Sequence, residues 1–384
     1  MKVLQVHNFY QQPGGEDQVY DAERELLTRH GHEVIRYAVH NDAIRNMSAL
    51  ELGIRTIWSR KSYLAVRETL REHRPDIVHA HNTFPLISPA IHHAAGAEQV
   101  PLVQTLHNYR LICAGATLYR KGRVCEDCVH SLTPWPAVRH ACYRNSRAAT
   151  VVAASMLLAH RAAGTWASRV QQYIALTGFS KQKFVEGGLP ANLISIKPNF
   201  LSSDPGAGPG SGGYAMFAGR LSEEKGLRTL LEAWRKLPDL PLKIAGDGPL
   251  RSFVESRVNT LQQVEYLGQC EHRRVVDLLR QARFLVFPSE WYEGLPMIIV
   301  EALACGTPVI ASALGSMTEL IQDGLNGCSF EPGNADSLAA CIGLVLAKGR
   351  DLRKAARLSY ERKYTPERNY ELLMNIYGNA SSTA

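Results

Sequence analysis

Two glutamates, Glu293 and Glu301, lie in the stretch WYEGLPMIIVEALACGTPVIAS (291–312), which is otherwise rich in apolar residues. Ionised carboxylates are costly to bury in such surroundings unless something binds them. Pro296 suits the first position of a helix and Gly306 ends it, so Glu301 should lie one to two turns inside, about 7 Å along the axis. A ligand with a central phosphate could meet the free N–H groups at the helix start, while each carboxylate accepts hydrogen bonds from a diol. A nucleotide sugar has that shape.

Two cations with a useful spacing occur further upstream. Arg220 and Lys225 lie in GRLSEEKG, directly after the apolar run YAMFAG. A guanidinium and an ammonium group five residues apart at the end of a strand are suited to hold a diphosphate. The alternative is a surface ion pair with the neighbouring Glu223 and Glu224.

Two other strand ends carry candidate ligand-binding groups. Gly14 and Gly15 in PGGED follow the first apolar run and open a predicted helix, where the backbone can approach a phosphate or a sugar closely. An ordinary turn explains this glycine pair equally well. His107 follows the run PLVQTL.

Half of the cysteines have a ligand-like spacing, C-x11-C-x2-C-x13-C. They are Cys113, Cys125, Cys128 and Cys142. Four thiolates of this kind are suited to bind zinc tetrahedrally, and a metal would stiffen a long loop that is poor in strands. His130 and His140 are alternative ligands, and free thiols, a disulfide or an iron–sulfur cluster stay open as interpretations.

The remaining cysteines are scattered and have no ligand spacing, so we expect them to be small core residues. They are Cys270, Cys305, Cys328 and Cys341. The apolar run at the N-terminus is too short for a secretory signal. We therefore expect a cytoplasmic chain whose cysteines are thiols or metal ligands rather than a disulfide framework.

Length and charge give coarser constraints. A chain of 384 residues exceeds the size at which one hydrophobic core usually keeps growing, which predicts two domains. The formal net charge is +7, and residues 101–200 hold 12 Lys and Arg against 3 Asp and Glu. This basic region predicts a phosphorylated ligand, an anionic membrane surface or nucleic acid as a partner, unless it is only a solvated face. A basic, aromatic-containing helix expected over residues 53–74 could rest on an anionic leaflet or pack on the first sheet.

Strand-like and helix-like segments alternate on both sides of a Gly/Ser/Pro-rich stretch at 201–213. The expected strands before it are KVLQVHNF, EVIRYAV, DIVHAH, PLVQTLH and YIALT, and those after it are YAMFAG, PLKIAG, VEYLG, RFLVFPS and TPVIA. This alternation predicts an α/β protein with two doubly wound parallel sheets. Ligands of such sheets bind beyond the carboxyl ends of the strands.

In combination these motifs resemble the retaining family-4 glycosyltransferases of the GT-B fold, also called glycosyltransferase group 1. EGLPMIIVEALACGTPVIAS is similar to the E-x7-E signature of that family, and GRLSEEKG to its Arg/Lys phosphate clamp. PGGEDQVYDAERELLTRHGHEV resembles its N-terminal Gly-Gly loop and helix, and VHAHN, TLHNYR, ALTGFSKQKF and KPNF follow in the expected order. The resemblance covers nearly the whole chain, but the four-cysteine segment is not part of the core family pattern.

The resemblance implies two Rossmann-like domains that face each other across a cleft. It places an acceptor-binding domain at 1–200, with a cysteine-rich insertion at 113–142. After the linker at 201–213, a nucleotide-sugar-binding domain follows at 214–360. The segment 361–384 is expected to form a helix that returns to the N-terminal domain, and the cleft to close by hinge motion at the linker.

The same resemblance implies roles for single residues. Arg220 and Lys225 would hold the donor diphosphate and stabilise charge on the leaving group. Glu293 would bind the donor hexose, Glu301 would bind the ribose hydroxyls, and His107 would contact the sugar near its reacting carbon.

Other donor contacts are expected from backbone groups. They belong to Gly14, Gly15, Gly294, Leu295 and Pro296. The base of the nucleotide is expected near residues 268–270, after VEYLG.

The implied activity is retaining transfer of a hexose from a UDP- or GDP-linked sugar to a hydroxyl acceptor, without a catalytic metal. The basic first half favours a lipid-linked saccharide of polysaccharide biosynthesis, at the inner membrane face, over a small soluble acceptor. Two rivals stay open. A nucleotide-sugar epimerase would use the donor pocket without an acceptor, and a nucleic-acid-binding protein would use the basic half. Base-reading aromatic residues are not clustered, so we expect no nucleic-acid partner.

Overall fold

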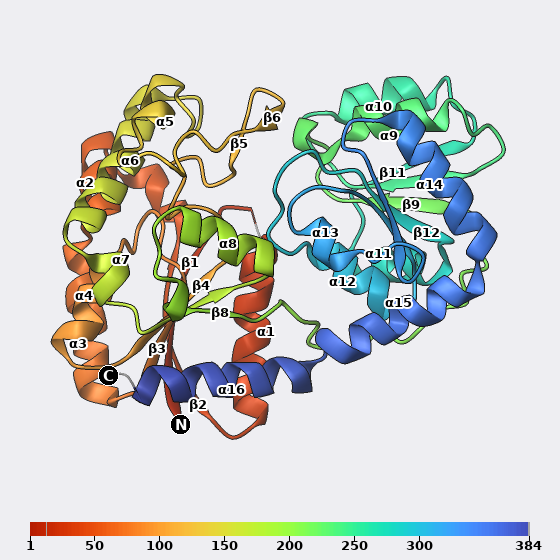
Figure 1. Ribbon diagram of the computed structural model, residues 1–384. Coiled ribbons are helices and arrows are strands. Elements are labelled where there is room, and N and C mark those ends of the chain that lie inside the picture. The colour runs from red at the N-terminus through yellow and green to blue at the C-terminus, as the bar shows by residue number, and fades with distance from the viewer. Residues whose placement is uncertain (13, 383–384) are drawn as a thin grey trace. The chain divides into compact units, whose positions relative to one another are not determined.

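The computed structural model describes residues 1–12 and 14–382, which form two compact units (Figure 1). Unit 1 contains Met1–Arg120, Cys125–Ser202 and the chain from Asn369 onward, and unit 2 contains Lys121–Val124 and Ser203–Arg368. The division at the C-terminal end falls inside the last helix, not at residue 361, where the sequence suggested it.

Unit 1 is built on a six-stranded sheet in the order β2-β1-β3-β4-β7-β8. Its strands are β1 (Lys2–Phe9), β2 (Glu33–His40), β3 (Ile77–Asn82), β4 (Leu102–Leu106), β7 (Gln172–Ala175) and β8 (Ile194–Ile196). Its helices are α1 (Gly15–Arg29), η1 (Asn41–Asn46), α2 (Ala49–Ile57), α3 (Arg60–His73), α4 (Ala90–Ala97), α5 (Trp135–Arg139), α6 (Arg147–Ala162), α7 (Thr165–Ser168), α8 (Gly178–Glu186) and η2 (Ala191–Leu193). All pairings in this sheet are parallel, while β5 (Tyr119–Arg120) and β6 (Arg123–Val124) form a separate ribbon.

Unit 2 is built on a second parallel sheet of six strands, in the order β11-β10-β9-β12-β13-β14. Its strands are β9 (Ala215–Ala218), β10 (Leu242–Ala245), β11 (Val264–Gly268), β12 (Phe284–Phe287), β13 (Val309–Ser312) and β14 (Gly327–Phe330). Its helices are η3 (Glu223–Lys225), α9 (Leu227–Trp234), α10 (Arg251–Val258), α11 (His272–Gln281), α12 (Met297–Ala304), α13 (Met317–Leu320), α14 (Ala335–Lys348) and α15 (Arg350–Lys363). The expected pair of doubly wound parallel sheets is therefore present.

Helices cover both faces of the sheet in unit 2. One hydrophobic cluster joins Phe217 and Val286 of the strands to Leu230 and Trp234 of α9 and to residues of α14. Side chains alternate along a strand, so Leu285 points to the opposite face, and α12 packs against β12 and β13. A sheet buried on both faces needs continuously apolar strands, which is why the apolar runs located these strands in the sequence.

The core of unit 1 is completed by the C-terminal helix α16 (Pro366–Ser382), drawn in dark blue in Figure 1. Its residues Leu373, Ile376, Tyr377 and Ala380 form one buried cluster with Val3, Leu27, Ile77, Val103 and Ile174. The hydroxyl of Tyr377 also lies 2.8 Å from Nδ1 of His79 on β3. The last helix of the chain thus packs on the sheet formed by its first strands.

The Gly/Ser/Pro-rich stretch, expected to be a flexible linker, lies along unit 2. The N–H groups of Gly208, Gly210 and Gly212 donate hydrogen bonds to the carbonyls of Cys305, Arg280 and Gln281. A Cβ on Gly208 would lie 2.2 Å from the carbonyl oxygen of Arg280. Glycine allows both flexibility and close backbone approach, and here it serves close approach, which the composition of the stretch does not reveal.

The basic segment 53–74 forms two helices rather than the single helix expected. The chain breaks between α2 and α3 at Ser59, whose hydroxyl accepts a hydrogen bond from the N–H of Ser62 at 3.3 Å and so caps α3. Val66 and Leu70 of α3 are buried. Among the described residues, no helix has the length and apolar character that crossing a bilayer requires.

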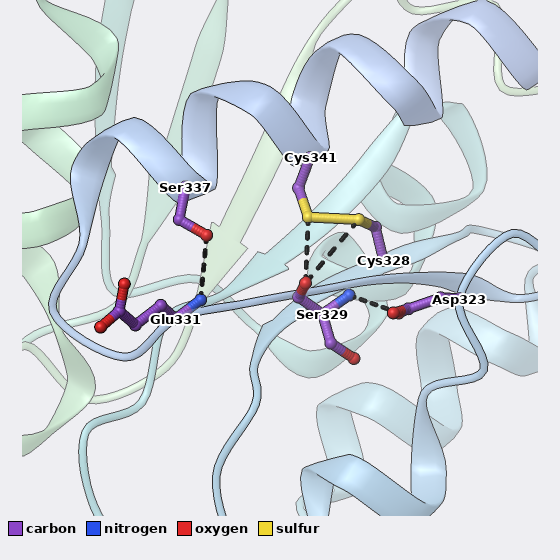
Figure 2. The surroundings of a disulfide bond; sticks show 6 residues. All are labelled: Asp323, Cys328, Ser329, Glu331, Ser337 and Cys341. Carbon is purple, nitrogen blue, oxygen red and sulfur yellow. Dashed lines mark hydrogen bonds between the residues drawn. A yellow bond between two sulfur atoms is a disulfide. The ribbon is translucent and has the colours of Figure 1, made fainter.

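Cys328 and Cys341 form a disulfide, which corrects their assignment as independent core thiols (Figure 2). Cys328 lies on β14 and Cys341 on α14, and their Cα atoms are 5.8 Å apart. The two residues are separated by 13 positions that include a turn between strand and helix. Only the packing of α14 on β14 brings them together, so their spacing gave no signal.

Candidate functional site

The order of the strands in unit 2 defines a place for a ligand. From β9 the chain builds the sheet outward in one direction through β10 and β11, then in the other through β12, β13 and β14. The helical connections of β9 and β12 therefore leave in opposite directions, which opens a crevice beyond the carboxyl ends of these two strands. Arg220 and Lys225 follow β9, and Glu293 follows β12.

Lys225 and Glu293 form an ion pair in this region. The Nζ of Lys225 lies 2.6 Å from Oε1 of Glu293, and the hydroxyl of Ser289 donates a hydrogen bond to the same oxygen at 2.8 Å. Only 18% of the Lys225 side chain and 9% of the Glu293 side chain are exposed. The ammonium also lies 5.4 Å from the ring centre of Trp291. A mostly buried cation and anion, 68 residues apart in the sequence, thus come together from the loops that follow two strands.

A close backbone contact fixes the loop that carries Lys225. Gly226 has φ +68°, and a Cβ there would lie 1.9 Å from the carbonyl oxygen of Pro288, at the end of β12. The N–H of Glu290 donates a hydrogen bond to the carbonyl of Glu224 at 2.8 Å. Because no other residue fits between these two loops, Gly226 in the motif EEKG is what allows Lys225 to reach Glu293.

Arg220 differs from Lys225 in its surroundings. Its side chain is exposed, and no hydrogen bond or ion pair joins it to another described residue. The structure therefore unites one of the two predicted clamp cations with Glu293 and leaves the guanidinium of the other available to a ligand.

Helix α12 begins at Met297, directly after Pro296, close to the predicted start. No side chain caps this end of the helix. The N–H of Ile299 donates to the carbonyl of Pro296 at 3.1 Å, which leaves those of Met297 and Ile298 to an anion. Leu295 is buried in the preceding loop, which also contains Gly294. Glu301 is 6% exposed, so it is not a solvated helix position.

The carboxylate of Glu301 has a partner that the sequence did not indicate. Nε2 of His272 lies 2.9 Å from Oε1 of Glu301, and this hydrogen bond raises the pKa of His272. His272 opens α11, four residues beyond β11, and 67% of its side chain is exposed. His272 follows residues 268–270, where the base of a nucleotide was expected. This position is the only feature of the sequence from which His272 could have been predicted.

The glycine pair lies at the start of α1 in unit 1. Gly14 is the N-cap residue with φ −119°, a conformation open to any residue, and its N–H donates a hydrogen bond to Asp17 at 2.8 Å. Among the described residues, leaving aside its chain neighbours, a Cβ on Gly14 would meet no atom closer than 3.8 Å. Neither the backbone conformation nor these contacts require glycine at this position.

His107 lies directly after β4 and contacts a second histidine. Its Nε2 is 3.1 Å from Nδ1 of His81, near the end of β3. Burial, reinforced by neighbouring histidines, holds the pKa of both rings well below its usual value, so both are neutral near pH 7. Behind them, Glu23 of α1 forms a fully buried ion pair with Lys197. His107 therefore rests on a rigid, buried polar network.

The other histidine of β3 has a core role. His79 is fully buried, and its ring nitrogens lie 2.8 Å from the hydroxyls of Tyr377 and Thr105. It bridges the sheet and α16.

A cavity that is open to solvent adjoins His107 in unit 1. Its lining includes His81, Asn108, Arg110, Phe84 and Trp166. The guanidinium carbon of Arg110 lies 4.1 Å from the centre of the Phe84 ring. The sequence had not singled out Arg110.

The four spaced cysteines also come together in unit 1. Cys113, Cys125, Cys128 and Cys142 line one cavity, together with His140, and all four are free thiols. His130, the other alternative ligand, has 64% of its side chain exposed and lies 3.8 Å from Glu126.

Two family models match the chain. The Glycosyl transferase 4-like domain matches residues 14–176, and Glycosyl transferases group 1 matches residues 207–363. Together the two models span most of both units.

Several known proteins are similar to the chain. The uncharacterized glycosyltransferase MJ1178 of Methanocaldococcus jannaschii is 36% identical over 177 residues, which are 45% of this chain and 50% of the relative. Glycogen synthase of Mycobacterium tuberculosis is 27% identical over 301 residues, which are 77% of this chain and 66% of the relative. The chain thus spans half to about two thirds of the length of these relatives.

The fold also has counterparts among solved structures. Anabaena Alr3699/HepE, solved in complex with UDP-glucose, matches with a TM-score of 0.67 and 18% identity over 98% of this chain and 100% of that one. With its two parallel-sheet domains and both family matches, the chain belongs to the group 1 glycosyltransferases, the family-4 type of the GT-B fold.

Proposed function

We propose that the protein transfers a hexose from a UDP- or GDP-linked sugar to a hydroxyl acceptor, with retention of the anomeric configuration. The observation that carries this proposal is the mostly buried Lys225–Glu293 pair. It lies beyond the carboxyl ends of β9 and β12, in a chain that belongs to a glycosyltransferase family. A matching structure that contains UDP-glucose supports the class of donor.

The charges of the unit 2 site fit a diphosphate. Lys225 and the unpaired guanidinium of Arg220 supply two positive charges, and the uncapped start of α12 adds the positive end of the helix dipole. Negative charge grows on the diphosphate as the bond to the sugar breaks, so these groups stabilise the transition state more than the ground state.

The carboxylates would recognise the uncharged parts of the donor. We propose that Glu293 accepts hydrogen bonds from the hexose and that Glu301, beside His272, accepts them from the ribose diol. The backbone of Gly294, Leu295 and Pro296 would line the sugar and the phosphate.

Residues of unit 1 complete the proposed donor contacts. The space beside Gly14 and Gly15 at the start of α1 suits a phosphate oxygen. His107, kept neutral by burial, would donate or accept a hydrogen bond at the sugar near its reacting carbon. In this scheme the leaving phosphate takes the proton of the acceptor hydroxyl, and catalysis requires no metal.

For the acceptor we propose a lipid-linked saccharide of polysaccharide biosynthesis, reached at the inner face of the membrane from the cytoplasm. The excess of cations in residues 101–200 supports an acceptor on an anionic carrier. A small soluble acceptor is the alternative, and assays with water-soluble and membrane-embedded saccharides distinguish the two.

A panel of UDP- and GDP-sugars tests the proposed donor. The matching donor should raise the melting temperature, since a ligand at about 100 times its Kd adds about 2.7 kcal/mol of stability. Lys225→Ala should remove this stabilisation and lower kcat/KM by about 100- to 1000-fold. Lys236→Ala is the matched control, because Lys236 is an exposed lysine that pairs with Asp336.

Three results would contradict the proposal. They are no stabilisation by any nucleotide sugar, wild-type turnover in Lys225→Ala, and conversion of the donor sugar in the absence of any acceptor. The last result would identify an epimerase.

A further inference from the structure

The loop between β4 and α6 gathers the four spaced cysteines from three separate positions in the chain. Cys113 precedes the β5–β6 ribbon, Cys125 and Cys128 follow it, and Cys142 lies beyond α5. They line a cavity of about 340 Å³ that is open to solvent. All four are free thiols, and no three of their sulfur atoms lie within 4.8 Å of one another.

A divalent cation attracts all four thiolates at once, and so favours their ionised form in this cavity.

The surroundings already hold groups that suit a metal-bound thiolate cluster. Four thiolates on a divalent ion carry a net charge of −2. The wall of the cavity holds both Arg120 and Asp127, which form an ion pair at 2.7 Å. Lys121, Arg123 and Arg139 belong to the same loop.

Two groups of described residues, neither of which includes a cysteine, hold three potential ligand atoms within 4.8 Å of one another, but a cation already pairs with each. In the group of Glu23, His79 and His81, the ammonium of Lys197 pairs with Glu23. In the group of Glu126, His130 and Glu186, the ammonium of Lys183 lies 2.9 Å and 2.8 Å from the two carboxylates. Both groups are therefore satisfied without a metal.

The cysteine sulfurs are further apart than the atoms of those two groups, so an ion would draw them inward. Zn–S bonds of about 2.3 Å in a tetrahedron place sulfurs about 3.8 Å apart. The loop has little regular structure that resists such a movement, since only the two-residue strands β5 and β6 and the five-residue α5 lie between Cys113 and Cys142.

We propose that Cys113, Cys125, Cys128 and Cys142 bind one structural zinc ion, which fixes the wall of the cavity beside His107. The link to that cavity is Arg110. Its guanidinium donates a hydrogen bond to the carbonyl of Ala114, next to Cys113, and lies 4.9 Å from the ring centre of Tyr143, next to Cys142. By fixing Cys113 and Cys142, zinc would fix the neighbouring Ala114 and Tyr143, which contact Arg110.

Metal analysis of the full chain tests the proposal directly. The protein is produced in zinc-supplemented medium and purified without a His-tag or chelator. Its metal content is then measured by inductively coupled plasma mass spectrometry. About one zinc ion per chain is expected. Cys125→Ser/Cys128→Ser should retain less than about a tenth of it, whereas Cys270→Ser, at a half-buried free cysteine of unit 2, should keep the full amount.

A second measurement covers the case in which the double variant does not fold. The wild-type protein is stripped of zinc with a chelator and reloaded with Co²⁺, whose visible absorption reports tetrahedral coordination and whose charge-transfer bands count thiolates. Four thiolates are expected, and a lower count would assign a ligand position to His140. Stripping should also lower the melting temperature and make the four thiols reactive, and zinc should restore both.

Several outcomes overturn the proposal. Metal-free protein whose four thiols react in the folded state would show that the cysteines are ordinary thiols. Iron with a sulfide chromophore would indicate a cluster instead. Peptide mapping that finds a disulfide among these four residues, in addition to Cys328–Cys341, would show that they pair covalently. None of these outcomes depends on glycosyltransferase activity.

Discussion

At the scale of single residues, the two glutamates of unit 2 show how a carboxylate in apolar surroundings is stabilised by a partner side chain. Glu293 lies against Lys225, and Glu301 against His272, at 2.6 Å and 2.9 Å. Removing Lys225 would leave the mostly buried carboxylate of Glu293 without its cation, which is unfavourable. Glu301 differs, because its partner His272 is 67% exposed. A diphosphate that attracts Lys225 must therefore be accompanied by new partners for Glu293, and the hydroxyls of a sugar are such partners. We expect phosphate and sugar to bind better together than either does separately.

Glu16 offers a test of buried charge in unit 1. Burial raises its pKa from 4.5 to about 7, although Tyr10 and Asn108 donate hydrogen bonds to it. Because the folded-state pKa is the higher one, the folded chain binds more protons than the unfolded chain between those values, and stability falls as the pH rises through that window. Glu16→Gln changes the free energy of unfolding, and this change should be about 1–2 kcal/mol more stabilising near pH 8 than near pH 5.

Calorimetric melting of wild type and variant at the two pH values measures this difference. Glu25→Gln is the control, since Glu25 is exposed and pairs with Arg29, and its effect should differ little between the two pH values. An equal effect of Glu16→Gln at both pH values would show that its carboxyl group titrates normally.

At the scale of elements, close contacts between backbones position the loops of unit 2. Gly226 lies against Pro288, and the stretch 203–213 follows the ends of α11 and α12. Apolar runs predicted ten of the strands. β8 and β14 are only partly apolar, and β5 and β6 have two residues each, so the pattern missed them. The composition of 201–213 could not distinguish a flexible chain from a closely packed one.

The candidate site was predictable to a different extent. Glu293, Arg220 and Lys225 could be located because they follow strands and match a spacing. His272 and Arg110 could not, since their partners lie on other elements and only the packed fold defines the contact.

Replacing Gly226 tests the backbone contact. Gly226→Ala should cost about 2 kcal/mol or more, because its φ is left-handed and its Cβ would overlap the carbonyl of Pro288. The displaced loop should also weaken stabilisation by the donor. Gly343→Ala is the matched control within α14, where a Cβ meets no atom within 4 Å, and it should raise stability by up to about 1 kcal/mol. Equal melting temperatures for the two variants would contradict the interpretation.

At the scale of the whole molecule, the chain closes unit 1 with its last helix. The expectation that the C-terminal segment returns came from the family resemblance, since the periodicity of α16 shows an apolar face but not what covers it. His79 and Tyr377, 298 residues apart, illustrate the difficulty. No local pattern connects such positions.

A substitution in α16 should therefore destabilise the unit that contains the first strands. Leu373 is fully buried against β1 and β3 residues, and Leu373→Ala should cost about 2–5 kcal/mol. Hydrogen exchange should show the loss of protection in β1, β3 and β4 rather than in unit 2. Leu358→Ala, at a position 48% exposed in α15, is the control and should change little. Unchanged protection in β1 after Leu373→Ala would show that α16 is dispensable.

The position of α16 has a consequence for biosynthesis. A ribosome releases the strands of unit 1 long before residues 369–382 exist, so the nascent sheet must wait with Val3, Ile77 and Val103 uncovered while all of unit 2 is translated. Unit 2, contiguous except for residues 121–124, can fold as it emerges. Unit 1 is therefore the first unit to be synthesised and the last to complete its fold. In the interval, the uncovered strands of unit 1 are the surface to which chaperones would bind.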